Sequence, residues 1–266
     1  MWCRFLFLAV FLILSVSQSN GLRSQNNFSV DLELVLAVDI SNSMDDDELR
    51  LQRDGYVSAF RHPEVLQAIS SGRHGRIAVT YVEWAGETLQ FVRVPWTLID
   101  SDTAAELFAE RLENEPLKNA SRTSLSGVLG KAVGLFSGNG YSGTRRVIDI
   151  SGDGTNNSGS PVAEMRDRVV QRGITINGLP LMLRPAYLSG FSDAVELNDF
   201  YRDCVIGGTG AFLITVEKLS ELTIAIRQKL ILEMAGRQPR ILKASFARSR
   251  PKVDCLIGEK LRFEDP

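Results

Sequence analysis

The residues of this chain whose types and spacing could do chemistry begin directly after the apolar run 34–38. Asp39, Ser41 and Ser43 place one carboxylate and two hydroxyls at alternate positions. A buried strand that ends in this way brings three hard oxygen atoms to one point. Hard oxygens are the ligands that Mg²⁺, Mn²⁺ and Ca²⁺ select. The pattern therefore predicts a divalent-cation site, and it indicates metal-dependent binding rather than catalysis.

Two further segments offer oxygen ligands in comparable positions. Thr123 directly precedes a predicted helix, and Asp153, which Gly154 follows, comes just after a predicted buried strand. In open α/β sheets, ligands bind beyond the carboxyl ends of the strands. We therefore expect these loops to meet the first one at the same edge of a sheet. The local alternative is that the same side chains only cap helices and form turns.

The elements that must position these loops alternate along the chain. Apolar runs predict strands at residues 33–38, 76–82, 89–94, 146–150, 174–179 and 211–216. Helical periodicity and caps predict helices at residues 45–60, 102–112, 124–136, 161–172, 193–201 and 220–235. Such alternation predicts a doubly wound, mostly parallel α/β sheet of about six strands with helices on both faces. The second and third strands are close enough to form a hairpin, so we expect one antiparallel edge strand.

With these elements in place, the sequence resembles the von Willebrand factor A domain family. The metal-ion-dependent adhesion site of that family has the pattern Asp-x-Ser-x-Ser, then a distant Thr, then an Asp-Gly after a strand. The pattern is matched in order by Asp39, Ser41, Ser43, Thr123 and Asp153. The resemblance covers roughly residues 32–235 and implies a Rossmann-like A domain. More narrowly, the chain is similar to secreted bacterial proteins that contain this domain and whose activity is not known.

The resemblance also implies roles for the matched residues. Ser41, Ser43 and Thr123 would bind the cation through their hydroxyls, and Asp39 and Asp153 would do so directly or through water. The implied cofactor is Mg²⁺, with Mn²⁺ or Ca²⁺ as alternatives. One coordination position would remain for an Asp or Glu carboxylate of a protein partner. The second cation site of some integrin A domains is not expected here, because the acidic run 45–48 fits the start of a helix.

Composition and the two ends of the chain limit the classes of protein to which it could belong. The 266 residues are 44% apolar and 23% charged, and the formal net charge of -2 gives no electrostatic case for nucleic-acid binding. We expect a signal peptide at residues 1–19, a von Willebrand factor A-like domain at 20–236 and a basic, solvated tail at 237–266. An uncleaved anchor would need about 20 apolar residues, more than the first run has. These features predict a secreted or periplasmic protein without a membrane span after cleavage.

Three cysteines remain to be placed. Cys3 would leave with the signal peptide, so the mature chain would keep Cys204 and Cys255. An even pair in an oxidising compartment favours a disulfide, which would tie the C-terminal tail to the body of the protein. The alternative is two separate thiols.

The pattern as a whole predicts a binding module and not an enzyme. A cation with an open position could also activate water, so a metal-dependent hydrolase is one alternative. A cell-envelope assembly factor with a structural metal is another. Hydrolysis would call for a base, and His62 and His74, the two histidines of the chain, lie in turn-rich sequence away from the predicted loops.

Overall fold

The computed structural model describes residues 27–183, 197–236 and 252–264. The predicted signal peptide lies outside the described residues, as do positions 184–196 and 237–251. No helix in the described part of the chain is both long enough and apolar enough to pass through a lipid bilayer.

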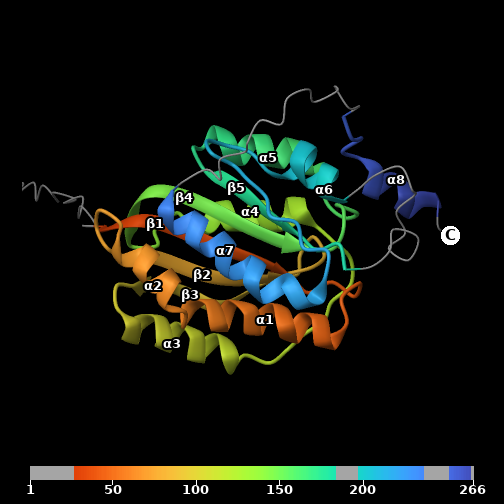
Figure 1. Cartoon of the computed structure of the whole chain (residues 1–266). Coiled ribbons are helices and arrows are strands. Elements are labelled where there is room, and N and C mark those ends of the chain that lie inside the picture. The colour runs from red at the N-terminus through yellow and green to blue at the C-terminus, as the bar shows by residue number, and fades with distance from the viewer. Residues whose placement is uncertain (1–26, 184–196, 237–251, 265–266) are drawn as a thin grey trace, which may run out of the picture.

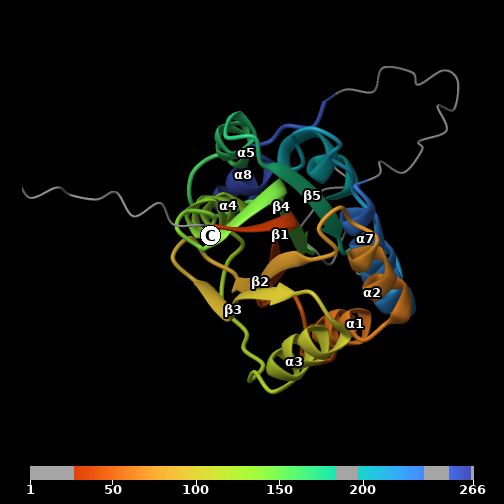
Figure 2. The same ribbon diagram turned by 90° about the vertical axis from the view of Figure 1, so that its left-hand side faces the viewer.

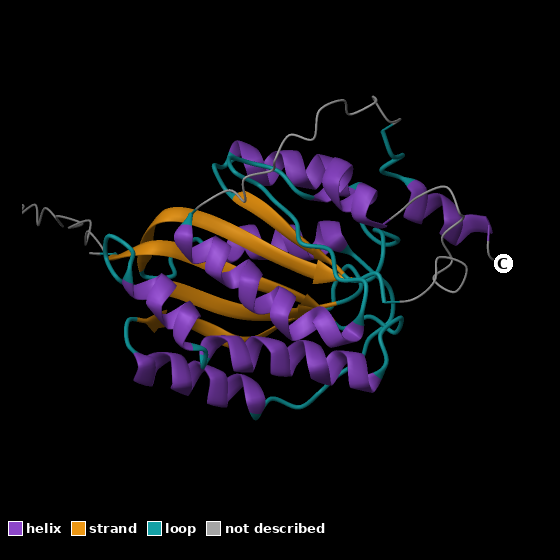
Figure 3. Cartoon of the chain, viewed as in Figure 1, coloured by secondary structure: helices purple, strands orange, loops and turns teal. Residues whose placement is uncertain are grey.

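A five-stranded sheet forms the centre of the molecule, in the order β3-β2-β1-β4-β5 (Figure 3). Its strands are β1 (Phe28–Asp39), β2 (Ile77–Trp84), β3 (Gln90–Ile99), β4 (Tyr141–Gly152) and β5 (Thr175–Pro180). Every neighbouring pair is parallel except β2 and β3, which are antiparallel and place β3 at the edge. The predicted fold class and its antiparallel edge strand are confirmed.

The central strand β1 explains the apolar run that precedes Asp39. Both of its neighbours are parallel strands, and helices cover both faces, so residues 32–39 are almost entirely buried. A strand in this position is apolar without alternation because neither face meets water. Its register pairs Asp39 with Trp84 at the end of β2, and Val38 with Ser151 near the end of β4. The ends of three strands therefore lie side by side.

Helices cover the sheet on both sides (Figures 1 and 2). One face carries α1 (Asp46–Phe60), α2 (Pro63–Ser70), α3 (Asp102–Glu113) and α7 (Leu222–Ala235). The other carries α4 (Leu125–Leu135), α5 (Val162–Gln171), α6 (Leu197–Phe200) and the π-helical turn Tyr201–Val205. A 3₁₀ turn, Leu219–Glu221, precedes α7, and α8 (Ile257–Glu264) lies beyond the carboxyl ends of the strands, on the right of Figure 1.

The segment predicted as a sixth strand, 211–216, is the main departure from the predicted elements. It makes only two isolated parallel bridges to the β5 edge, Gly178 with Leu213 and Leu181 with Val216. The ladder breaks between them because Pro180 has no N–H to donate. Near the start of the segment, the Phe212 N–H bonds the side chain of Asn177 on β5 instead of a strand carbonyl. The helix α2, which begins at a proline, was not predicted.

Candidate metal site

Asp39 is the innermost member of the candidate site. It is the last residue of β1, and its side chain is fully buried. Its Oδ1 accepts a hydrogen bond of 2.8 Å from the backbone N–H of Ser41. Its Oδ2 is buried without a hydrogen-bond partner in the described structure. A buried carboxylate oxygen that lacks a partner is costly, so this atom indicates that a further group belongs at this position.

Ser41 and Ser43 bring two hydroxyls above Asp39. Their Oγ atoms are 2.9 Å apart, and Ser43 Oγ donates a hydrogen bond of 2.6 Å to Asp153 Oδ1. Ser41 is buried, Ser43 is exposed and Asp153 is half-buried. The loop after β1 and the loop after β4 are therefore in direct contact through predicted site residues. The cluster opens towards solvent on the side of Ser43 and Asp153.

Thr123 reaches the same cluster from a third loop. Its backbone N–H bonds Asn157 Oδ1 at 2.9 Å, and its carbonyl accepts from the Asn157 N–H at 2.9 Å. A Cβ on Gly154 would lie 3.3 Å from Thr123 Oγ1, so that hydroxyl lies beside the residue that follows Asp153. The preceding residue, Arg122, has a φ of 75°, a left-handed conformation that non-glycine residues rarely adopt. The structure thus brings all five predicted residues to one place.

Three buried polar groups border the backbone of Gly152, beneath these loops. Asp39 Oδ2, the Tyr201 hydroxyl and Trp84 Nε1 each lack a hydrogen-bond partner among the described residues. A Cβ on Gly152 would lie 2.8 Å from Asp39 Oδ2, 2.9 Å from the Tyr201 hydroxyl oxygen and 3.2 Å from a ring carbon of Trp84. Glycine is therefore required where β4 ends, because any side chain would displace the Asp39 carboxylate.

Electrostatics also favour a cation at this position. Burial raises the pKa of the Asp39 carboxyl well above its ordinary value, and the nearby charge of Asp153 raises this pKa further. The hydrogen bond from the Ser41 N–H acts in the opposite direction. Two carboxylates that disfavour each other's charge are both stabilised by a dication.

The donor set also bears on which cation would fit. Among the described residues, no group of three or more His, Cys, Asp or Glu side chains converges. A cation here would therefore be held by hydroxyls as well as two carboxylates. Such an all-oxygen set suits Mg²⁺, Ca²⁺ and Mn²⁺, and the residues present fit a hard divalent ion.

Sequence reasoning missed the side chains that support this site. Gln52, on α1, donates from Nε2 to the carbonyl of Asp39 at 3.1 Å and accepts from Ser151 Oγ at 2.9 Å. Asn156 accepts from the Ser126 N–H at 3.0 Å and so links the β4–α5 loop to the first turn of α4. A polar residue at a core-facing helix position was the available signal for Gln52. No sequence signal distinguishes Asn156 from an ordinary loop residue.

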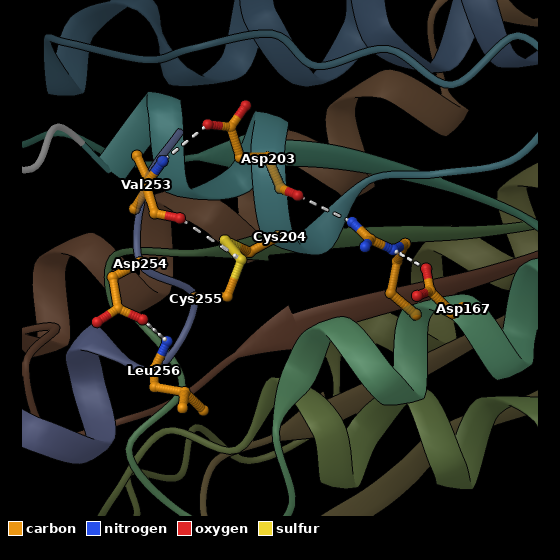
Figure 4. Close-up of a disulfide and its surroundings, with 8 residues drawn as sticks. Asp167, Asp203, Cys204, Val253, Asp254, Cys255 and Leu256 are labelled. Atoms are coloured by element: carbon orange, nitrogen blue, oxygen red, sulfur yellow. Dashed lines mark hydrogen bonds and ion pairs between the residues drawn. A yellow bond between two sulfur atoms is a disulfide. The ribbon is translucent and has the colours of Figure 1, made fainter. Parts of the chain in front are cut away.

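The two cysteines predicted to pair, Cys204 and Cys255, lie next to the candidate site. They form a disulfide with an S–S distance of 2.00 Å (Figure 4). It connects the π-helical turn Tyr201–Val205 to the segment that precedes α8. Nearby, the Val253 N–H donates to Asp203 Oδ2 at 3.1 Å. The described part of the tail is thus a packed segment and not the solvated extension that the sequence predicted.

Both histidines lie at the opposite end of the sheet from the candidate site, where the parallel strands begin. His62 is the N-cap of α2, and its Nε2 is 2.7 Å from a guanidinium nitrogen of Arg227. The backbone N–H of His74 donates to both carboxylate oxygens of Asp31, near the start of β1. Neither imidazole can reach a group held by Asp39 and Asp153.

Comparison with solved structures shows the von Willebrand factor A fold, as the sequence resemblance predicted. Proximal thread matrix protein 1 from the mussel byssus is 14% identical with a TM-score of 0.58, over 79% of this chain and 48% of that one. The von Willebrand factor domain of the type V pili tip protein Mfa5 from Porphyromonas gingivalis is 10% identical with a TM-score of 0.54, over 79% and 97%. A von Willebrand factor type A protein from Catenulispora acidiphila is 14% identical with a TM-score of 0.52, over 77% and 43%.

The mussel protein has also been solved with a zinc-occupied metal-ion-dependent adhesion site; that structure is 15% identical with a TM-score of 0.58, over 79% of this chain and 49% of that one. This chain therefore spans about half the length of the mussel protein. The profile of one family, described as "Protein of unknown function (DUF1194)", matches residues 29–238. No curated protein matches the chain.

Proposed function

The chain belongs to the DUF1194 family, and we propose that it is a secreted or periplasmic binding module whose divalent cation engages an acidic group on a protein partner. In this proposal the cation is held by Asp39, Ser41, Ser43, Thr123 and Asp153. Residues 1–19 act as a signal peptide, 20–236 form the A-type domain and 237–266 its C-terminal extension. The proposal treats the chain as a binder without catalytic activity.

One observation carries the proposal: a buried carboxylate oxygen without a partner, Asp39 Oδ2, lies beneath a contact between Ser43 and Asp153 that faces solvent. A cation would stabilise the buried oxygen, and the solvent-facing side of the site would leave that cation accessible to a ligand. A cation bound here would supply Lewis acidity towards an incoming oxygen. The protein's residues hold the cation and exclude water from its inner side.

An incoming Asp or Glu side chain suits such a site because it meets a dication that the protein compensates only in part. Three of the five proposed ligands are neutral hydroxyls, and Asp39 and Asp153 bind the cation directly or through water. A partner carboxylate is an anionic oxygen ligand and can replace a bound water on a cation whose protein ligands leave one position open. The gain is greatest for a carboxylate because hydroxyls and amides carry no full charge.

Binding is favoured over hydrolysis by the position of the bases. His62 and His74 lie where the strands begin, whereas the proposed site lies where they end. A water-activating mechanism requires a base within hydrogen-bond reach of that water. The carboxylates at the site are assigned to holding the cation, which leaves the imidazoles without a role in this proposal.

The proposal is tested by the thermal stability of the wild type, Asp39→Ala and Asp153→Ala in EDTA, Mg²⁺, Mn²⁺ and Ca²⁺. A ligand that binds only the folded state stabilises it by about 2.7 kcal/mol at one hundred times its dissociation constant. We expect the wild type to melt at a higher temperature with at least one cation and the two variants to show no cation-dependent shift. An identical melting temperature of the wild type in all four solutions would contradict the cation site.

The partner half of the proposal needs its own measurement. Peptides that contain one Asp or Glu, and matched peptides with Asn or Gln, are titrated onto the protein with saturating cation and again in EDTA. We expect the acidic peptides to bind only with the cation present and only to the wild type, not to Asp39→Ala. If the acidic and amide peptides bind equally, the cation site stands, but the cation does not recognise carboxylates.

A further inference from the structure

The described part of the C-terminal tail packs beside the loops of the proposed site. Val253, Cys255 and Ile257 contact the apolar cluster between the sheet and the α4–α5 layer. Gly258 approaches the β4–α5 loop so closely that a Cβ there would lie 2.3 Å from the Asn156 carbonyl oxygen and 2.4 Å from Thr155 Oγ1. Only glycine allows this contact, which indicates a fitted interface and not a loose extension.

The first connection between the tail and the site is covalent. The disulfide from Cys255 ends at Cys204, within the π-helical turn Tyr201–Val205 (Figure 4). The same turn begins with Tyr201, whose buried hydroxyl borders Asp39 Oδ2 over Gly152. Short π-helical turns occur often at functional sites. The tail is therefore fastened three residues from a side chain that lies against the innermost carboxylate.

The second connection runs through Glu259 on α8. Its Oε1 accepts a hydrogen bond of 2.7 Å from Asn156 Nδ2, and its Oε2 is buried without a partner in the described structure. Asn156 Oδ1 in turn accepts from the Ser126 N–H at the start of α4. Asn156 lies three residues after Asp153 in the same loop, and its neighbour Asn157 holds the backbone of Thr123.

These two connections meet the site from different sides. The disulfide acts on the turn beneath Asp39, and Glu259 acts on the loop that carries Asp153. We propose that the tail segment 252–264 is a brace of the cation site, with Glu259 and Tyr201 as positioning residues that hold the loops in their cation-binding arrangement. This inference rests on the proposed function, because it concerns the affinity of the same site.

A brace and a simple staple differ in what they change. A disulfide that only restricts the unfolded chain raises the stability of the fold without altering the affinity of the folded protein for a ligand. Residues that orient metal ligands from behind change metal affinity, typically by 10- to 100-fold when they are replaced. The dissociation constant of the folded protein therefore separates the two roles.

The test compares four proteins with the wild type by calorimetric titration with Mn²⁺, at a temperature where circular dichroism shows each of them folded. Glu259→Gln removes the charge that accepts from Asn156, and Cys204→Ser with Cys255→Ser removes the disulfide. Lys260→Gln is the matched control, because Lys260 is the next residue on α8 and its ion pair is with Asp254 in the same segment. Asp39→Ala removes the site itself.

A second readout needs no cation. Hydrogen exchange in EDTA reports local opening of the backbone. We expect the peptide that covers residues 151–160 to exchange faster in Glu259→Gln and in the double cysteine variant, and at the wild-type rate in Lys260→Gln. Exchange within β1 serves as the internal reference for the stability of the whole domain.

The expected result is that the Mn²⁺ dissociation constant rises at least tenfold in Glu259→Gln and in the double cysteine variant, while Lys260→Gln matches the wild type. If both variants bind Mn²⁺ as the wild type does, the brace is overturned and the proposed function stands. If the wild type binds no cation, the proposed function falls and this inference falls with it. Should the double cysteine variant not fold, Glu259→Gln alone decides the outcome.

Discussion

Ser43 donates a hydrogen bond of 2.6 Å to Asp153, which lies 110 positions further along the chain. The contact exists because β1 and β4 are parallel neighbours, so that the loops after them leave the same edge of the sheet. Parallel strands separated by other elements bring distant segments together in this way. This one bond links the first and last parts of the predicted pattern.

The first prediction follows from this bond. In Ser43→Ala, Asp153 loses a donor and the site loses one hydroxyl ligand. We expect the dissociation constant for Mn²⁺ to rise at least about tenfold, as measured by calorimetric titration. Because Ser43 is exposed, the melting temperature in EDTA should change little. The neighbouring exposed residue supplies the control: Asn42→Ala removes a bond to Ser121 and should bind Mn²⁺ as the wild type does. Equal loss in both variants would contradict the assigned role.

The second prediction concerns the space over Gly152. A Cβ there would overlap Asp39 Oδ2 and the Tyr201 hydroxyl, so Gly152→Ala must push the carboxylate aside. Overpacking of a filled core costs about 1–3 kcal/mol, and we expect a loss of unfolding free energy in that range, measured by urea denaturation. We also expect Mn²⁺ binding to fall in the variant that remains folded.

A matched glycine provides the control for that substitution. Gly134, in the last turn of α4, has no atom within 4 Å of an added Cβ. Alanine is more favourable than glycine in a helix, by about 0.5–1 kcal/mol at interior positions and less near an end. Gly134→Ala should therefore leave the protein as stable as the wild type or more so, with unchanged Mn²⁺ affinity. A comparable loss in both variants would indicate that the space over Gly152 has no special role.

The sequence contains enough to predict the fold class and the five candidate ligands. The apolar run before Asp39 and the loops at Thr123 and Asp153 are local patterns, and the alternation of strands and helices predicts the edge where they meet. The prediction of a strand at 211–216 was wrong because Pro180, on the neighbouring strand, has no backbone N–H to donate to a continuous ladder. That effect depends on which strands become neighbours, which local sequence does not reveal.

The supporting residues could not be predicted for a related reason. Gln52, Tyr201 and Glu259 act through contacts with residues that are distant in sequence, and each has an ordinary local context. The spacing of a ligand motif is fixed by the loop that carries it. The spacing between a supporting side chain and that loop is fixed by packing, and many sequence separations can produce the same contact.

The third prediction concerns a buried ion cluster between the sheet and α7. Lys229 Nζ lies 2.5 Å from Asp149 Oδ1 and 2.8 Å from Glu233 Oε1, and all three side chains are about 1% exposed. Asn177 donates to both oxygens of Glu233 at 2.8 and 2.9 Å. Lys229→Met leaves two buried carboxylates without their cation. Removing one partner of a buried pair costs about 3–5 kcal/mol, and we expect a loss of that size in urea denaturation.

An exposed ion pair serves as the comparison for Lys229. Arg168 and Glu164 are 3.6 Å apart on α5, with side chains 64% and 63% exposed. Exposed pairs contribute little, typically below about 1 kcal/mol. Arg168→Met should therefore leave the urea midpoint nearly unchanged. If Lys229→Met and Arg168→Met shift the midpoint equally, the buried cluster does not have the structural importance that its burial implies.

The fourth prediction is a pH dependence that arises from Asp149. Burial raises the pKa of its carboxyl from 3.8 to about 6; the charge of Glu233 adds to this rise, and Lys229 opposes it. Because the folded state holds this proton more tightly than the unfolded state, the stabilising contribution is complete below about pH 4 and is lost as the pH rises through 6. We expect the unfolding free energy of the wild type, relative to Asp149→Asn, to fall by on the order of 2 kcal/mol between about pH 4 and pH 7. Urea denaturation of both proteins across this range measures the difference. A difference that stays constant, or that grows with pH, would mean that Asp149 is already ionised in the folded protein and fully compensated by Lys229.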